Sequence, residues 1–139
     1  MSELHQAVFT ESLAEVYRSL DAGNDVNETD HTGQTPLMLA VANENIRIIE
    51  LLLNRGANVN ASGHNEWQAL HHAVDISIDG TIQANGSAGS EPVSIIDILI
   101  GCGADLLSKN NEGHTPLDIA RIYGNKKVTD HLLKKYERE

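Results

Sequence analysis

The feature that most constrains this chain is a constant interval at which its leucines and glycines recur. Leu4, Leu37 and Leu70 are evenly spaced, and Gly23 and Gly56 repeat the same interval. A fixed period of about 33 residues is typical of chains that stack copies of one small unit, because a single unit cannot bury its apolar face alone. The sequence therefore predicts a repeat array instead of one irregular core.

The next copies of both markers come late, which locates an insertion. Leu117 follows Leu70 by more than one period, and Gly103 follows Gly56 by the same longer interval. Both markers therefore give the same excess over the period, and the extra length falls in a polar segment. We place the insertion at about 76–89.

The insertion itself contains a hairpin pattern followed by a tether. Its first part, ISIDGTIQ, places isoleucines around an Asp-Gly pair, which favours a tight β-turn. A lone hairpin is only marginally stable in water. Two interpretations stay open: a disordered surface loop, or a contact loop, since inserts in repeat arrays map to loops on one face. The predicted contact residues are Ile76, Ile78, Asp79 and Ile82.

One unit, GQTPLMLAVANENIRIIELLLNRGANVNAS at 33–62, predicts two helices. Thr35 can cap the first helix and Pro36 can occupy its first turn. The second helix carries a broad apolar stripe, and Gly56 is expected to end it in a left-handed conformation. The residues of that stripe are Ile46, Ile48, Ile49, Leu52 and Leu53.

Four short motifs carry a family resemblance: TPLMLA at 35–40, TPLDIA at 115–120, RGANVN at 55–60 and CGADLL at 102–107. Together with the period, they resemble the ankyrin-repeat family. The resemblance implies an all-α fold in one domain over residues 1–139, a solenoid of four helix-turn-helix repeats joined by β-hairpin-like finger loops. The expected repeats are about 1–32, 33–65, 66–112 with the insertion, and 113–139.

The charge is strongly negative and unevenly spread. The net charge is −10, and residues 1–108 contain fifteen acids against three bases. Such a surface repels nucleic acid and anionic membranes and favours a basic protein partner. The alternative is an acidic surface that only keeps the protein soluble.

Several classes of function have no sequence support. Cys102 is the single cysteine, which excludes an internal disulfide and a cysteine-based metal site. His5 and His71 occupy a position that the family uses structurally, and no catalytic triad or phosphate-binding loop is present. The first residues lack a basic start and an apolar segment, so no secretory leader is expected. We predict a cytoplasmic monomer without enzyme activity, cofactor or metal.

The resemblance implies that the chain binds another protein through its concave face and finger loops. Trp67 is the only tryptophan, and it is either a binding anchor or a local packing residue. The role is that of a general adaptor or, alternatively, of a dedicated inhibitor such as an immunity protein that masks a basic toxin. Besides the insertion, the predicted contact residues are His31, Gln34, His64, Asn65, Trp67, Asp75, His114 and Tyr123.

Overall fold

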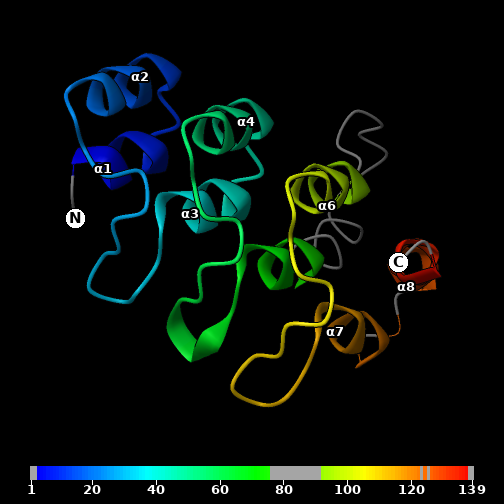
Figure 1. Cartoon of the computed structure of the whole chain (residues 1–139). Helices are drawn as coiled ribbons and strands as arrows, with labels where there is room; N and C mark the ends of the chain where they lie inside the picture. The colour runs from blue at the N-terminus through cyan, green and yellow to red at the C-terminus, as the bar shows by residue number, and fades with distance from the viewer. Residues whose placement is uncertain (1–2, 76–91, 123, 125, 138–139) are drawn as a thin grey trace.

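The computed structural model describes residues 3–75, 92–122, 124 and 126–137 as a row of helix pairs linked by long loops (Figure 1). The described residues contain helices and no β-strand, which confirms the predicted all-α class. The elements are α1 (Glu3–Phe9), α2 (Leu13–Asp21), α3 (Pro36–Ala42), α4 (Ile46–Asn54), the short 3₁₀ turn η1 (His64–Glu66), a helix over 69–75, α6 (Pro92–Gly101), α7 (Pro116–Ile122) and α8 (Lys126–Glu137).

The helices form two rows. The first helices of the pairs form an inner row, which contains α1, α3, the helix over 69–75 and α7 (Figure 1). The second helices form an outer row, drawn above the inner one, which contains α2, α4 and α6 and continues with α8. Helices contact their neighbours within a pair, as α1 with α2 and α7 with α8, and between pairs, as α1 with α3 and α2 with α4. The loops project away from the outer row, so the inner helices and the loop tips share one face (Figure 1). We call it the inner face.

Two inner helices, α3 and α7, begin at side-chain caps. The Thr35 hydroxyl accepts a hydrogen bond from the N–H of Met38 at 3.2 Å, as the sequence predicts for this residue. In α7 the bonding is reciprocal: the Asp118 N–H donates to the Thr115 hydroxyl at 3.1 Å, and the Thr115 N–H donates to the Asp118 carboxylate at 3.0 Å. This pair is a capping box, which satisfies two backbone donors that the helix leaves unpaired.

The third inner helix lacks the Thr-Pro start and uses a histidine instead. The N–H of Gln68 donates to Nδ1 of the buried His71 at 3.1 Å. The Nε2 atom of His71 therefore carries the proton, and it lies 3.0 Å from the carbonyl oxygen of His114. The His71 side chain thus caps its own helix and bonds that helix to the next loop tip. His5 makes the same kind of link, with Nε2 2.8 Å from the Gln34 carbonyl oxygen, which confirms the structural role predicted for both histidines.

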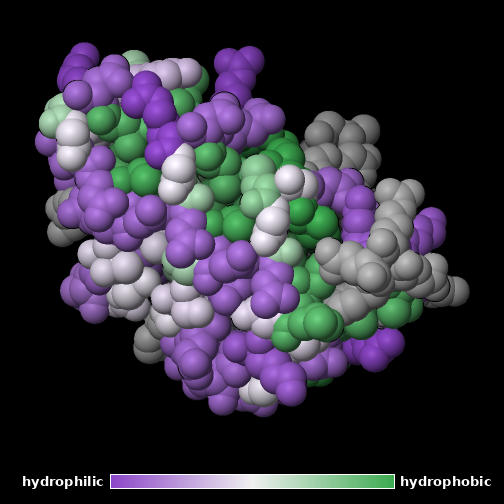
Figure 2. Space-filling view, viewed as in Figure 1, coloured by the Kyte–Doolittle hydropathy of each residue, from purple (hydrophilic) through white to green (hydrophobic). Residues whose placement is uncertain are grey.

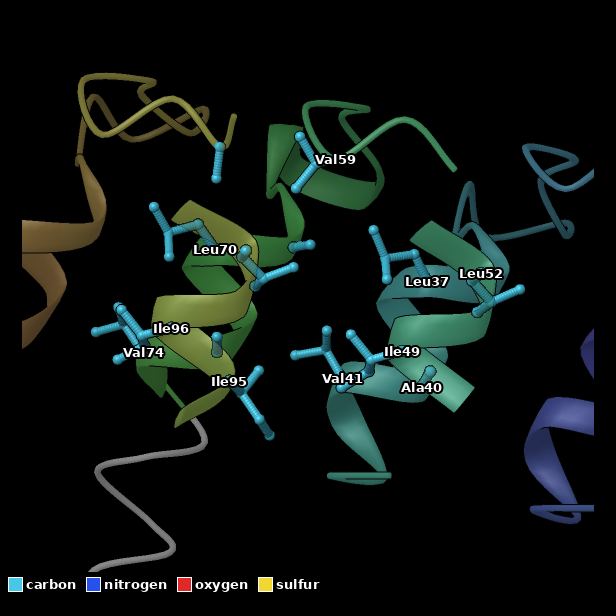
Figure 3. Close-up of a cluster of buried hydrophobic side chains, with 14 of the residues drawn as sticks. Leu37, Ala40, Val41, Ile49, Leu52, Val59, Leu70, Val74, Ile95 and Ile96 are labelled. Atoms are coloured by element: carbon cyan, nitrogen blue, oxygen red, sulfur yellow. The ribbon is translucent and has the colours of Figure 1, made fainter. Parts of the chain in front are cut away.

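The core runs continuously between the pairs. Figure 3 draws Leu37 and Leu52 in α3 and α4, and Leu70 and Ile96 in the following pair, and all four side chains are almost completely buried. Since each apolar stripe is covered by the next pair, the stack supplies the burial that no single pair could achieve. Removing one such leucine side chain typically costs about 2–5 kcal/mol.

Glycines end the outer helices as the sequence predicts. Gly56 follows α4 with a φ of 94°, and the equivalent Gly23 and Gly103 have φ values of 96° and 97°. These left-handed angles are strained for residues with a Cβ atom, which explains why glycine recurs there. Among the described residues, no helix combines the length and the apolar character that crossing a membrane would require.

Candidate protein-binding surface

Three loop tips, at 30–34, 63–67 and 110–114, project from equivalent positions of the array. In each tip the N–H of the first residue donates to the carbonyl oxygen of the fifth, at 3.0, 2.8 and 2.9 Å respectively. This closure gives the hairpin-like finger loops that the resemblance implies. It places the fifth residue of each tip, Gln34, Trp67 or His114, where the tip joins an inner helix.

The first and third tips are each braced by the side chain of their first residue. Oδ1 of Asp30 accepts hydrogen bonds from the N–H groups of Thr32 and Gln34 at 2.9 and 3.0 Å. Burial alone would raise the pKa of Asp30, but the hydrogen bonds from Thr32 and Gln34 outweigh it and lower the pKa to about 2. Oδ1 of Asn110 accepts from the N–H of His114 at 3.1 Å in the same way. Both tips are therefore rigidly closed at neutral pH.

The middle tip departs from this pattern at its first residue. Gly63 stands where the other tips have Asp30 and Asn110. A Cβ atom on Gly63 would lie 2.8 Å from Sδ of Met38 and 3.0 Å from the carbonyl oxygen of Gly33. A larger residue cannot fit without moving the neighbouring tip, so the middle tip packs closely on its neighbour and loses the side-chain brace.

The backbone of the middle tip is also strained. Asn65 and Glu66 have φ values of 59° and 61°, in the left-handed region. At the position of Glu66 the other tips have Gly33 and Gly113, with φ values of 86° and 80°. A residue with a Cβ atom pays about 1–2 kcal/mol in this region, and such strain tends to persist at functional positions.

We expect the Glu66→Gly variant to raise the free energy of unfolding by about 0.5–1 kcal/mol, because relief of the left-handed strain exceeds the extra entropy of glycine in the unfolded chain. The measurement is a urea titration followed by circular dichroism. Gly113→Ala is the matched control: no atom lies within 4 Å of a Cβ there, so strain alone should lower stability by about 1 kcal/mol. A Glu66→Gly variant that is less stable than the parent would contradict this account.

Trp67 joins the middle tip to the third inner helix. Its ring is half-buried and packs against the core. The ring centroid lies 5.8 Å from that of His71 and 5.2 Å from that of His72, with both ring pairs tilted. Burial lowers the pKa of His72 to about 4, with a smaller contribution from His71, and burial also lowers the pKa of His71. Both imidazoles are therefore neutral at pH 7, and Trp67 lies against uncharged rings.

Trp67 also separates two hollows on the inner face. One, of about 270 Å³, we call the Asp75 hollow. The other, of about 230 Å³, we call the Ile122 hollow. The Asp75 hollow is lined by Gln34, Asn65, Trp67, His72 and Asp75. The Ile122 hollow is lined by Trp67, Asn110, Glu112, His114, Ile119 and Ile122.

The two tips around Trp67 are held in place by direct bonds. The Asn111 N–H donates to the Asn65 carbonyl oxygen at 2.9 Å, and the Asn111 side-chain amide donates to Oδ1 of Asn65 at 3.3 Å. The Ile122 hollow, to which both tips contribute, is thus bounded by tips that are bonded to one another. Such a preorganised surface costs less to order when a partner binds.

The structure brings five of the predicted contact residues together around the hollows. These are Gln34, Asn65, Trp67, Asp75 and His114. His31 is exposed on the first tip, away from either lining. The side chain of His64 and residues Ile76, Ile78, Asp79, Ile82 and Tyr123 lie outside what the structure describes.

Five lining residues were not among the predicted contact residues: His72, Asn110, Glu112, Ile119 and Ile122. His72 and Ile119 occupy equivalent positions of two inner helices, and Ile122 is 60% exposed on α7. The repeat register alone could have found them, since Ile119 is the equivalent of His72 and Ile122 is the equivalent of Asp75. Phe9, 58% exposed, holds the corresponding position at the end of α1.

Metal chemistry has no support in the described part of the chain, where no group of three or more potential ligands is close enough to hold an ion. The face seen in Figure 2 is mainly hydrophilic, with hydrophobic side chains showing between the hydrophilic ones. The arrangement of an aromatic ring between two hollows suits recognition of side chains from another molecule.

Comparisons with known proteins agree with this architecture. The chain is similar to the B-cell lymphoma 3 protein homolog of Mus musculus, with 33% identity over 139 residues, which cover 99% of this chain and 27% of the relative. It is 32% identical over 108 residues to NF-kappa-B inhibitor delta of Mus musculus, covering 78% of this chain and 28% of the relative. The chain thus spans about a quarter of the length of these curated relatives.

A solved structure and a family model complete the comparison. The crystal structure of the ankyrin repeat domain of Bcl-3, titled a unique member of the IkappaB protein family, matches with a TM-score of 0.77 at 34% identity, covering 96% of this chain and 51% of that one. A family model described as "Ankyrin repeats (3 copies)" matches residues 4–80, more than half of the chain. The motif spacing, the helix pairs and these matches together show that the chain belongs to the ankyrin-repeat family.

Proposed function

We propose that this chain binds a basic protein partner through its inner face, with Trp67 at the centre of the contact. The observation that carries the proposal is the pair of hollows that share Trp67, with the middle and third tips beside it bonded to each other. Membership of a protein-interaction family supports the binding role. Fold alone does not determine function, so the geometry of this site carries the argument.

The charge of the chain supports a basic partner. Residues 1–108 hold fifteen acids and three bases, and carboxylates of Asp75 and Glu112 line the two hollows. A negative field of this kind attracts a basic protein and raises its association rate. The same field disfavours nucleic acid and anionic membranes as partners.

A second candidate is a dedicated inhibitor that masks a functional surface of its partner. One relative is named NF-kappa-B inhibitor delta, so an inhibitor of another protein exists among the similar sequences. The general adaptor and the inhibitor differ in their partners: the inhibitor should capture one protein in a stable stoichiometric complex and block its activity. An adaptor should bind without abolishing the partner's activity.

The salt dependence of association tests the electrostatic part of the proposal. The partner is captured with the full chain, identified by mass spectrometry, purified, and mixed with the chain in a stopped-flow instrument. We expect the association rate constant to fall about tenfold or more between low and high salt, while the dissociation rate constant changes less. An association rate that does not respond to salt would contradict a basic partner. Binding of a protein by the inner face would then be tested separately, by measuring the affinity of Trp67 variants for the partner.

A further inference from the structure

Building on the proposed function, we propose that the Asp75 hollow receives an arginine side chain of the partner. The hollow combines an aromatic ring, a carboxylate and amide groups at the junction of two tips and an inner helix. No Lys or Arg is among its described lining residues. The proposal deepens the binding role by naming the chemical group that this part of the inner face recognises.

The walls of the hollow match the two properties of a guanidinium group. Its flat, weakly hydrated surface stacks on aromatic rings, and the Trp67 indole lines the hollow. Its N–H donors suit carboxylate and amide oxygens, which Asp75, Gln34 and Asn65 bring to the same lining. A lysine ammonium would satisfy the charge but would not stack as a plane.

The described lining residues add no positive charge to the hollow at neutral pH. His72 is the titratable base among them, and burial keeps its pKa at about 4. At neutral pH it is an uncharged ring beside Trp67. Acidic residues outnumber basic ones fifteen to three over residues 1–108, so the wider field also favours a cation.

Glu50 provides a control within the same chain. It is an exposed carboxylate on α4 and lines neither hollow. A carboxylate-to-amide change there alters the overall charge as much as the same change at Asp75 does. Glu50→Gln therefore separates the local effect of the Asp75 carboxylate from the effect of net charge.

The test uses the fluorescence of Trp67, the only tryptophan, in the full chain. The probes are N-acetyl-argininamide, its lysine counterpart and its citrulline counterpart, which keeps the shape of arginine without the charge. We expect saturable quenching by the arginine probe with a dissociation constant of about 1 mM, as for a good ligand of this size. The lysine probe should bind about fivefold or more weakly, and the citrulline probe should give no saturable response.

The variants then locate the binding. Asp75→Asn should weaken binding of the arginine probe by about fivefold or more, while Glu50→Gln should leave its affinity within about twofold. Circular dichroism checks that both variants fold. If Asp75→Asn is unfolded, the comparison of the arginine and citrulline probes on the unmodified chain still tests the proposal.

Equal quenching by arginine and citrulline, or no saturation by arginine, would overturn this inference. A loss of affinity that is the same in both variants would also overturn it, because the effect would then come from net charge. Each of these results concerns the Asp75 hollow alone. A different result would contradict the proposed function, namely an affinity for the partner that Trp67→Ala leaves unchanged.

Discussion

Replacing His71 with leucine is expected to lower the free energy of unfolding by about 3 kcal/mol. The side chain is fully buried, accepts the N–H of Gln68 through Nδ1 at 3.1 Å, and donates through Nε2 to the His114 carbonyl oxygen at 3.0 Å. Leucine fills much of the same volume, so the loss reports the two hydrogen bonds. The N–H of Gln68 and the carbonyl of His114 would both be left without this partner, at about 1–3 kcal/mol each.

The measurement is equilibrium unfolding in urea, with His31→Leu as the matched control. His31 is exposed on the first loop tip, so the same exchange there should change stability by no more than about 0.5 kcal/mol. If His71→Leu costs less than about 1 kcal/mol, the link between the third inner helix and the last tip contributes little to stability.

Replacing Trp67 with alanine is expected to weaken binding of the partner by about 2 kcal/mol or more, roughly thirtyfold in the dissociation constant. The ring lines both hollows, so its removal takes away surface that each would offer a bound side chain. Stability should fall by less, because the ring is only half-buried. Isothermal titration calorimetry measures the first effect and urea unfolding the second.

Trp67→Phe is the matched variant for this prediction. It keeps an aromatic face against His72 and should retain most of the affinity. A large loss of stability together with unchanged affinity in Trp67→Ala would assign Trp67 to local packing. The alternative stated from the sequence, that Trp67 is a local packing residue, would then hold.

Most of the fold could be predicted because its signals are local and repeated. Thr35 caps α3 through its own hydroxyl, and Gly56 ends α4 with a positive φ, so the residue type alone indicates the geometry. The period then predicts the same caps and helix-ending glycines in the other repeats, as the cap at Thr115 shows. The structural role of His71 followed from its position in the family motif.

The candidate site was predicted less completely, because hollows depend on how separate repeats meet. The sequence pointed to Trp67, but it did not indicate that Gly63 lets the middle tip pack against Met38. His72 and Ile122 line the hollows only because neighbouring tips and helices come together there. A comparison of equivalent positions would have shown Glu66 among glycines and Gly63 in the position of Asp30 and Asn110, and both are local signals of the unusual tip.

The central claim is that the partner binds over Trp67, and fluorine NMR tests it most directly. Growing the full chain with 5-fluorotryptophan gives a single reporter, since Trp67 is the only tryptophan. Size-exclusion chromatography establishes independently that the complex with the purified partner has formed. We predict that the Trp67 resonance shifts on complex formation and becomes less accessible to a soluble paramagnetic quencher. An unchanged resonance with unchanged accessibility in the saturated complex would contradict the account.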